Sequence, residues 1–368
     1  MKINTSRQDL FNVVNKVKSV VASKSALPIL SHVLVQASDG QVKLSATDLK
    51  VSIECFVDCE VEREGSMTVA SHLLASILSE LPDSEISIEL SDNNVIMLDC
   101  GSIHTKLFSM SPDEFPAIRE FEGVEPLTFP QEFLRKLFSK TSFSICTDQA
   151  RYNLTGLLFE IRDGLVIVVA TDGRRMSLYK EQSRILDELN VRVIIPGKMI
   201  YELERLLGNE GDVEIYLDES QVAFSFENTR LVSALIEGNF PNYDMIIPKK
   251  HDKIVVVETV QLSEAMRRTR TMTNEKFNTV RLQISEDRML LRVVTPEVGE
   301  YEEEVPVQYD GEDIDVAFNP AFVAEILRHI EEEKTSFVLK DGGNPGLIKP
   351  FKEEGPDNYL NVVMPIRV

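Results

Sequence analysis

The sequence lacks any long hydrophobic segment. Its 368 residues contain no run of about 18 or more apolar residues, which excludes a transmembrane helix. The opening stretch MKINTSRQDLF has no continuous apolar core, so we expect no secretory signal peptide, and no low-complexity tract indicates disorder. Cysteine is also scarce, since Cys55, Cys59, Cys100 and Cys146 are too few for a disulfide scaffold. These absences favour a folded protein of the reducing cytoplasm.

The motifs of several catalytic classes are missing as well. No GxxxxGK(S/T) loop is present to hold a nucleotide phosphate, and the five histidines are scattered without the spacing of zinc ligands. No serine or cysteine lies in a recognisable nucleophile setting. We therefore expect no catalytic residue, no metal site and no cofactor.

Basic residues are in the minority. Lys and Arg number 39 against 60 Asp and Glu, which gives a net charge of −21. An evenly spread negative charge would repel nucleic-acid phosphates and argue against such a partner. Hydrophobic residues make up 43% of the chain, enough for a core in each of the two to three domains that its length predicts.

What the chain does contain is an internal repeat with a period of 124 residues. Each copy has an alternating apolar strand, a polar turn and a second alternating strand, which is typical of a β-hairpin. Three landmarks recur at this spacing: Leu34, Leu158 and Leu282 in the first strands, Asp39, Asp163 and Asp287 in the turns, and Thr47, Thr171 and Thr295 after the second strands. Their agreement at two successive steps predicts three copies of one structural unit.

Helical segments flank each hairpin in the same order. Apolar residues at i, i+3 and i+4 predict helices near 6–21, 130–142 and 260–273 before the hairpins, and near 71–81, 197–207 and 320–333 after them. Further strands follow each second helix. The sequence therefore predicts an α+β fold of three tandem helix–sheet domains, with boundaries at 1–124, 125–250 and 251–368.

Charge is sorted by element. The first helix of every copy carries a net charge of +2, although the chain as a whole is strongly acidic. One such helix is ordinarily a solvated amphipathic face, whereas three in register favour a repeated basic surface for a polyanion. Units that repeat can close into a ring whose lining is basic and whose exterior is acidic. The candidate cations of the second and third copies are Arg135, Lys136, Lys140, Arg267, Arg268 and Arg270.

At this point the residues resemble a known family, the bacterial sliding clamps, which are the beta subunits of DNA polymerase III. The resemblance covers essentially the whole chain. It is carried by LPIL from Leu27, ATDGRRMSL from Ala170, GNFPNYDMIIP from Gly238, TNEKF from Thr273 and the final VVMPIRV.

The resemblance implies a head-to-tail homodimer whose six domains form a ring around duplex DNA, with helices inside and sheets outside. It implies no catalytic activity. The expected role is to tether the replicative polymerase, and other proteins that carry a clamp-binding motif, to DNA of any sequence. A separate ATP-driven clamp-loader complex is expected to open the ring and load it. Weak, sequence-independent phosphate contacts suit a protein that must slide.

The resemblance also implies a pocket for short apolar partner peptides between the second and third domains. Its residues here are Leu154, Thr171, Gly173, Arg174, Arg175, Met176, Pro241, Ile246, Asn319, Phe322, Val362, Met364, Pro365, Ile366 and Arg367. Methionine and aliphatic side chains suit an adaptable apolar surface, and Arg175 and Arg367 are expected to hold polar groups at its rim. Relatives often carry His at position 174, Arg at 245 and Tyr at 322, so Arg174, Met245 and Phe322 predict a changed peptide preference. Without the resemblance, core packing would be the simpler interpretation of these residues.

Two further sets of residues follow from the resemblance. Lys24, Arg151, Tyr152 and Lys198 are expected to contact DNA, together with the cations of the basic helices. The dimer joint is expected to pair an edge near Leu107 and Phe108 with an edge containing Glu300, Glu302, Glu303 and Glu304, close to Met272. The ordinary alternative for the glutamate run is a solvated face.

Two other functions remain open at the level of sequence. A carboxylate-metal nuclease or phosphotransferase would need an acidic cluster, which the spread of Asp and Glu does not suggest. A repeat interaction protein that never contacts DNA would leave the basic helices without a role.

Overall fold

The chain folds into two compact units. The structure is a computed structural model and describes residues 1–21, 26–91, 93–183, 189–248 and 252–367. One unit comprises Met1–Arg135 and Lys198–Leu235, and the other comprises Lys136–Gly197 and Ile236–Val368. The middle repeat thus contributes to both units, and the three expected domain boundaries stay a prediction.

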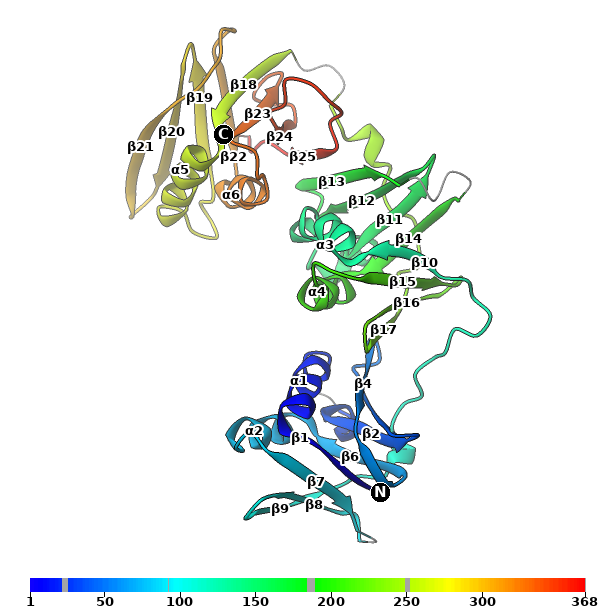
Figure 1. The fold of residues 1–368 in the computed structure, drawn as a ribbon. Helices are drawn as coiled ribbons and strands as arrows, with labels where there is room; N and C mark the ends of the chain where they lie inside the picture. Colours follow the sequence, from blue (N-terminus) through cyan, green and yellow to red (C-terminus); the bar gives the residue numbers. More distant parts are fainter. Residues whose placement is uncertain (22–25, 92, 184–188, 249–251, 368) are drawn as a thin grey trace. The chain divides into compact units, whose positions relative to one another are not determined.

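The first unit contains two antiparallel sheets (Figure 1). A five-stranded sheet has the order β5-β1-β7-β8-β9, formed by Glu60–Arg63, Lys2–Ser6, Glu85–Leu90, Val95–Cys100 and Ile103–Phe108. An eight-stranded sheet has the order β10-β15-β16-β17-β4-β3-β2-β6, formed by Leu127–Pro130, Asp212–Leu217, Gln221–Phe226, Thr229–Ala234, Val51–Asp58, Gln41–Thr47, His32–Ser38 and Gly65–Ala70.

The second unit also contains two antiparallel sheets. Its eight-stranded sheet has the order β14-β11-β12-β13-β25-β24-β23-β18, formed by Val191–Pro196, Gly156–Arg162, Leu165–Thr171, Arg175–Gln182, Tyr359–Val363, Gly346–Pro350, Lys334–Leu339 and Lys253–Glu258. Its four-stranded sheet has the order β21-β20-β19-β22, formed by Gly299–Pro306, Arg288–Thr295, Val280–Ser285 and Ile314–Phe318.

All six expected helices are present. The first helices of the repeats are α1 (Arg7–Lys18), α3 (Gln131–Ser139) and α5 (Thr259–Thr271), and the second helices are α2 (Ser71–Glu80), α4 (Gly197–Leu206) and α6 (Pro320–Arg328). Figure 1 shows α1 beside α2, and α5 beside α6. No helix among the described ranges is long and apolar enough to cross a membrane.

All six helices are shorter than predicted, and α6 differs most at its C-terminal end. The prediction for α6 extended to residue 333, but the helix ends at Arg328. The carbonyl groups of Glu332 and Glu333 instead accept hydrogen bonds from Thr259 at 2.8 Å each. These bonds draw the chain out of the helix and into β23.

The three hairpins are confirmed as β2–β3, β11–β12 and β19–β20. The landmark aspartates occupy the turns with positive φ: 48° at Asp39, 52° at Asp163 and 57° at Asp287. Aspartate tolerates this left-handed conformation better than most residues. The recurring aspartate is therefore explained by backbone geometry.

Two strand pairings join successive repeats. In the first unit β4 pairs with β17 from Thr229↔Cys55 to Ser233↔Val51. In the second unit β13 pairs with β25 from Arg175↔Val363 to Tyr179↔Tyr359. A continuous ladder of backbone hydrogen bonds therefore crosses each seam between repeats.

Candidate peptide pocket and nucleic-acid surface

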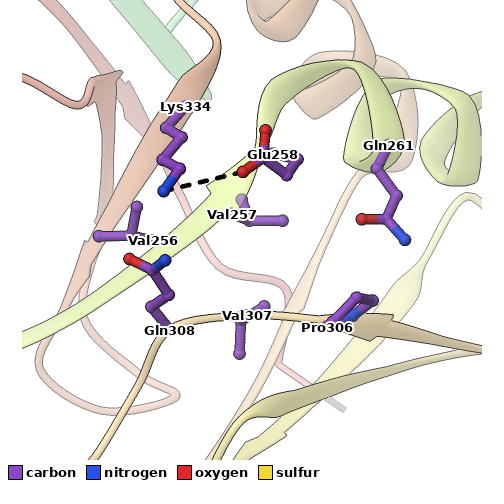
Figure 2. A pocket seen from close by; sticks show the side chains of 8 residues that line it. All are labelled: Val256, Val257, Glu258, Gln261, Pro306, Val307, Gln308 and Lys334. Carbon is purple, nitrogen blue, oxygen red and sulfur yellow. Dashed lines mark ion pairs between the residues drawn. The ribbon is translucent and has the colours of Figure 1, made fainter.

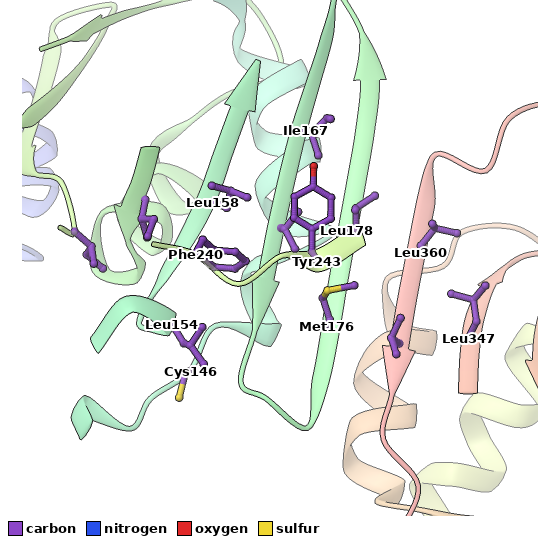
Figure 3. Close-up of a cluster of buried hydrophobic side chains, with 14 of the residues drawn as sticks. Cys146, Leu154, Leu158, Ile167, Met176, Leu178, Phe240, Tyr243, Leu347 and Leu360 are labelled. Carbon is purple, nitrogen blue, oxygen red and sulfur yellow. The ribbon is translucent and has the colours of Figure 1, made fainter. Parts of the chain in front are cut away.

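The second unit gathers the residues expected to form the peptide pocket. Leu154, Met176 and Val362 belong to one buried apolar cluster, and the partly buried Ile246 packs against it. Figure 3 shows Leu154 and Met176 among the labelled members of this cluster. The cluster takes side chains from β11, β12, β13, β24 and β25 and from the segment after residue 236. Residues far apart in the sequence therefore meet because β25 joins β13.

The expected pocket residues differ in exposure. Leu154, Thr171, Met176 and Val362 are buried, Arg175, Pro241, Ile246, Asn319, Phe322, Pro365 and Ile366 are half-buried, and Gly173, Arg174, Met364 and Arg367 are exposed. Of the half-buried members, Ile246 packs directly against the buried cluster.

A tight turn presents the two arginines. Thr171 Oγ1 donates to the Arg175 carbonyl at 2.6 Å and accepts from Gly173 N–H at 3.0 Å. The Asp172 carboxylate accepts from the backbone N–H groups of Arg174 at 2.8 Å and Arg175 at 3.0 Å. Gly173 has a φ of 80°, which favours glycine. The Thr-Asp-Gly sequence thus explains the turn.

The segment after β25 follows this turn. Met364 N–H donates to the Arg174 carbonyl at 2.9 Å, and Ile366 N–H donates to the Ala317 carbonyl at 2.8 Å. The side chain of Met364 remains 43% exposed. The backbone is therefore fixed while the thioether side chain stays accessible.

Arg175 is held from several directions. Its Nε donates to Asp172 Oδ2 at 3.2 Å and its Nη2 donates to the Phe143 carbonyl at 2.5 Å. Its guanidinium carbon lies 4.6 Å from the ring centroid of Phe322 and 5.4 Å from that of Phe143. Arg175 is therefore held by contacts within the chain, and its expected role at the rim of the pocket stays a prediction.

His329 extends this arrangement. Its ring stacks on Phe143 with centroids 4.4 Å apart and planes inclined by 10°. Its Nδ1 lies 2.9 Å from the Glu325 carbonyl. Burial lowers the pKa of His329 below its usual 6.5, since the charged imidazolium loses solvation.

The sequence did not single out Phe143, Asp172 or His329. The repeat contains a usable signal for Asp172, because Thr47 and Asp48 form the same hydrogen-bonded turn in the first unit. No sequence pattern connects Phe143 with His329, since only the fold brings them together.

The residues expected to contact DNA outside the first helices differ in their polar contacts within the chain. Lys24 lies outside the described residues. Arg151 is exposed and donates to the Asp172 carbonyl at 2.6 Å, and Tyr152 is 54% exposed. Lys198 Nζ lies 2.7 Å from Asp48 Oδ2.

The cations of the first helices also differ from one another. Arg135, Lys136, Arg267, Arg268 and Arg270 are exposed. Three of these make polar contacts within the chain: Arg135 with Asn209, Lys136 with Glu181 and Arg268 with Glu303.

Lys140 departs from the expectation of an accessible cation. Its side chain is only 8% exposed, and its Nζ lies 2.7 Å from Glu331 and 2.5 Å from the His329 carbonyl, to which it donates. The ammonium lowers the pKa of the Glu331 carboxyl through this hydrogen bond. Residues 329 and 331, which follow α6, both contact the Lys140 ammonium, so an ion pair with the exposed Glu331 replaces the expected free charge.

The two expected joint segments are edge strands of their sheets. β9 ends the five-stranded sheet of the first unit, and β21 ends the four-stranded sheet of the second. On β9 Phe108 is 80% exposed, whereas Leu107 is buried at 6%. On β21 Glu300, Glu302 and Glu304 are exposed, Glu303 is half-buried, and so is the nearby Met272.

A separate small cavity of about 150 Å³ lies beside β18 (Figure 2). Its lining includes Val256 and Gln308, and an ion pair of 3.8 Å joins Glu258 to Lys334 at its side. None of its lining residues belongs to the expected pocket. Within the described ranges, no group of three or more His, Cys, Asp or Glu residues could hold a metal ion.

Comparison with known families gives a match along nearly the whole chain. Three family models match the chain. The models of the N-terminal, central and C-terminal domains of the DNA polymerase III beta subunit match residues 1–119, 128–242 and 244–367, respectively. The three matches follow one another in the order of the internal repeats.

Individual relatives give the same result. The beta sliding clamp of Pseudomonas putida is 33% identical to the chain, and that of Chlamydia pneumoniae is 29% identical. Both alignments cover 100% of this chain, and they cover 100% and 99% of the respective relative. The crystal structure of a Pseudomonas aeruginosa sliding clamp bound to griselimycin matches with a TM-score of 0.94 at 32% identity, and both chains are covered completely.

Proposed function

The chain belongs to the DNA polymerase III beta subunits, the beta sliding clamps, and we propose how its own residues serve that role. It is a processivity clamp for DNA replication. The observation that carries this conclusion is the match to clamps over the full length of both proteins. The nuclease and interaction-protein alternatives have no comparable support.

The clamp is a head-to-tail homodimer that closes into a ring with helices inside and sheets outside. The free edges of β9 and β21 support this proposal, because an unpaired edge strand readily pairs with another chain. β9 carries the exposed Lys106, whereas β21 carries exposed glutamates such as Glu302. Opposite charge on the two edges favours pairing of unlike edges, which a head-to-tail ring requires.

The inner surface of the ring holds duplex DNA of any sequence without catalysing a reaction. Exposed cations on the first helices, including Arg135, Lys136, Arg267 and Arg270, support this proposal. Contacts to phosphate carry no sequence information and break readily in salt, so the ring slides while its closure prevents release.

Partner proteins bind through short apolar peptides at the cluster of Leu154, Met176 and Val362. Its apolar character and the exposed thioether of Met364 support this proposal, since methionine adapts to ligands of different shape. Griselimycin, which a related clamp binds, serves as the probe of this cluster. The expected partners at this cluster are the replicative polymerase, the clamp-loader complex and other proteins with a clamp-binding motif.

A topological experiment tests the ring. The protein is loaded on nicked circular duplex DNA with its cognate clamp loader and ATP, isolated at moderate salt, and the circle is then cut once. We expect retention on the circle and loss after cutting. Equal retention on both forms would contradict encirclement, and absence from both, with a loader shown to be active, would favour an interaction protein that does not hold DNA.

A binding experiment tests the pocket. Titration calorimetry with griselimycin compares the wild type with Met364→Glu and with Leu73→Glu. Both side chains are exposed, Met364 at 43% and Leu73 at 49%, but only Met364 belongs to the expected pocket, since Leu73 lies on α2 in the first unit. We expect weaker binding for Met364→Glu alone, because a carboxylate would lose hydration in an apolar contact. Equal losses in both variants would contradict the assigned location.

A further inference from the structure

Four side chains of the second unit form one stacked column. It runs from Phe322 to Arg175, then to Phe143 and His329, with neighbours separated by 4.6, 5.4 and 4.4 Å. Phe322 lies in the first turn of α6 and Arg175 begins β13, while Phe143 lies in the 3-10 turn Ser142–Ser144 and His329 caps α6. The column therefore ties both ends of α6 to the β13 side of the pocket.

Polar contacts hold Arg175 and the backbone at Phe143 and His329. Arg175 donates to Asp172 and to the Phe143 carbonyl, so its plane is set relative to the Thr171–Met176 turn. At the other end the His329 carbonyl accepts from Lys140 at 2.5 Å. A guanidinium held between two aromatic faces gains electrostatic attraction to both rings and loses much of its freedom to rotate.

We propose that Phe143 and His329 are positioning residues for peptide binding, acting through Arg175 on Phe322 without touching the ligand. This inference rests on the proposed function of the pocket. The column holds the Phe322 ring and the arginine turn in place before a ligand arrives. Binding then avoids the entropy cost of ordering these side chains, which is the general benefit of a preorganised site.

His329 is the end of the stacked column that can be tested most directly. His329 stacks on the Phe143 ring, and the Arg175 guanidinium contacts the same ring, so the imidazole restrains the orientation of the aromatic partner of Arg175. Removing the imidazole ring would leave Phe143 free to tilt, and the guanidinium would lose its second aromatic face. An aromatic replacement at position 329 would preserve the support.

The test measures the dissociation constant of griselimycin for five proteins by titration calorimetry. These are the wild type, Phe143→Leu, His329→Leu, His329→Phe and the control Phe133→Leu. Phe133 is half-buried like Phe143 and stacks on Phe129 at 5.6 Å, but it lies in the first unit. Thermal unfolding of each variant is recorded in parallel.

We expect Phe143→Leu and His329→Leu to bind about two- to fivefold more weakly, the range that a cation–π contact of ordinary strength corresponds to. His329→Phe and Phe133→Leu are expected to bind as the wild type does. Rescue by phenylalanine identifies the ring stack as the cause, because general destabilisation would not be reversed in this way.

Two results would overturn the inference while leaving the pocket intact. One is wild-type affinity in His329→Leu. The other is equal weakening in His329→Leu and His329→Phe. Both depend on position 329 alone, so the proposal stays testable even where Phe143→Leu fails to fold. A wild-type protein that does not bind griselimycin would instead overturn the pocket assignment itself, and the inference with it.

Discussion

At the scale of single residues, two adjacent arginines have opposite environments. Arg174 is exposed, whereas Arg175 is half-buried, hydrogen-bonded to Asp172 and packed against two aromatic rings. Lysine keeps the charge but has neither the planar fork nor the stacking face of arginine. The same substitution should therefore have different consequences at the two positions.

We expect Arg175→Lys to lower the free energy of unfolding by about 1–3 kcal/mol, because it disrupts hydrogen bonds to a charged group and leaves a half-buried carboxylate poorly paired. Arg174→Lys should remain within about 0.5 kcal/mol of the wild type, as is usual for exposed sites. Urea unfolding at neutral pH measures both values. Indistinguishable variants would show that the packing of Arg175 contributes nothing to stability.

His329 predicts a dependence of stability on pH. Burial lowers its pKa in the folded protein, and the nearby cations Arg328 and Lys140 act in the same direction, while the carbonyl and charge of Glu325 oppose them. As the pH falls below 6.5, the unfolded chain binds a proton before the folded chain does, so folding becomes less favourable. This contribution to stability is fully present above pH 6.5 and is lost as the pH falls toward the folded pKa.

The comparison of the wild type with His329→Phe measures this contribution. Unfolding free energies are determined at about pH 7.5 and about pH 5.5, on either side of the ordinary histidine pKa. We expect the wild type to lose more stability on acidification than His329→Phe, which has no titrating ring at this position. Parallel pH profiles would contradict the assignment.

At the scale of elements, Gly156 marks a place where two strands approach closely. It begins β11 opposite Pro196 of β14, and a Cβ atom at this position would lie 2.5 Å from the Ile195 carbonyl oxygen and 2.7 Å from Ile236 Cδ1. Such distances require backbone to move. The absence of a side chain at Gly156 therefore permits the pairing of β11 with β14.

We expect Gly156→Ala to lower the free energy of unfolding by about 1–3 kcal/mol, the usual cost of overpacking. Gly208→Ala is the matched control, because a Cβ atom there would make an ordinary contact of 3.5 Å with Gln131 Oε1. Denaturant unfolding compares the two variants. A loss at Gly208 as large as that at Gly156 would indicate a general effect of removing glycine.

Local elements were predictable from the sequence, because their signals are local. Apolar spacing located all six helices, and the recurring aspartates located the three hairpin turns. The extent of α6 was not predictable, since its end depends on hydrogen bonds from the distant Thr259.

The residues of the expected pocket were only partly predictable from the sequence. The resemblance to clamps supplied its apolar members, and the structure places Leu154, Met176 and Val362 in one cluster. The packing of Arg175 was not predictable, because Phe143 and Phe322 contact it from separate elements. Lys140 shows the same limit, since Glu331 lies 191 residues away in sequence.

At the scale of the whole molecule, the distribution of charge matters more than its sum. The chain has a net charge of −21, yet the first helix of every repeat is basic. Acidic surfaces elsewhere discourage nonspecific binding to nucleic acid, while the basic helices offer phosphate contacts. The function of the clamp in replication requires both properties at once.

We expect the double variant Arg267→Glu and Arg270→Glu to weaken the association of the loaded clamp with DNA. The slope of log K against log salt concentration should become shallower by about one for each phosphate contact that is lost. The control reverses the same number of charges at Lys349 and Lys352, which lie on and after β24. Fluorescence anisotropy over a salt series measures both. Equal effects would indicate that net charge alone controls binding.

The pairing of β13 with β25 also has a consequence for synthesis on the ribosome. Tyr179 and Tyr359 are ladder partners, so about 180 residues must be translated after β13 before that ladder can be completed. At roughly 5–20 residues per second this interval lasts about 9–36 seconds. Throughout it, the β13 edge that will pair with β25 is unpaired, and the proposed peptide pocket is incomplete because Val362 has not been made. We therefore expect that a growing chain binds no partner peptide at this pocket before its third repeat has been translated.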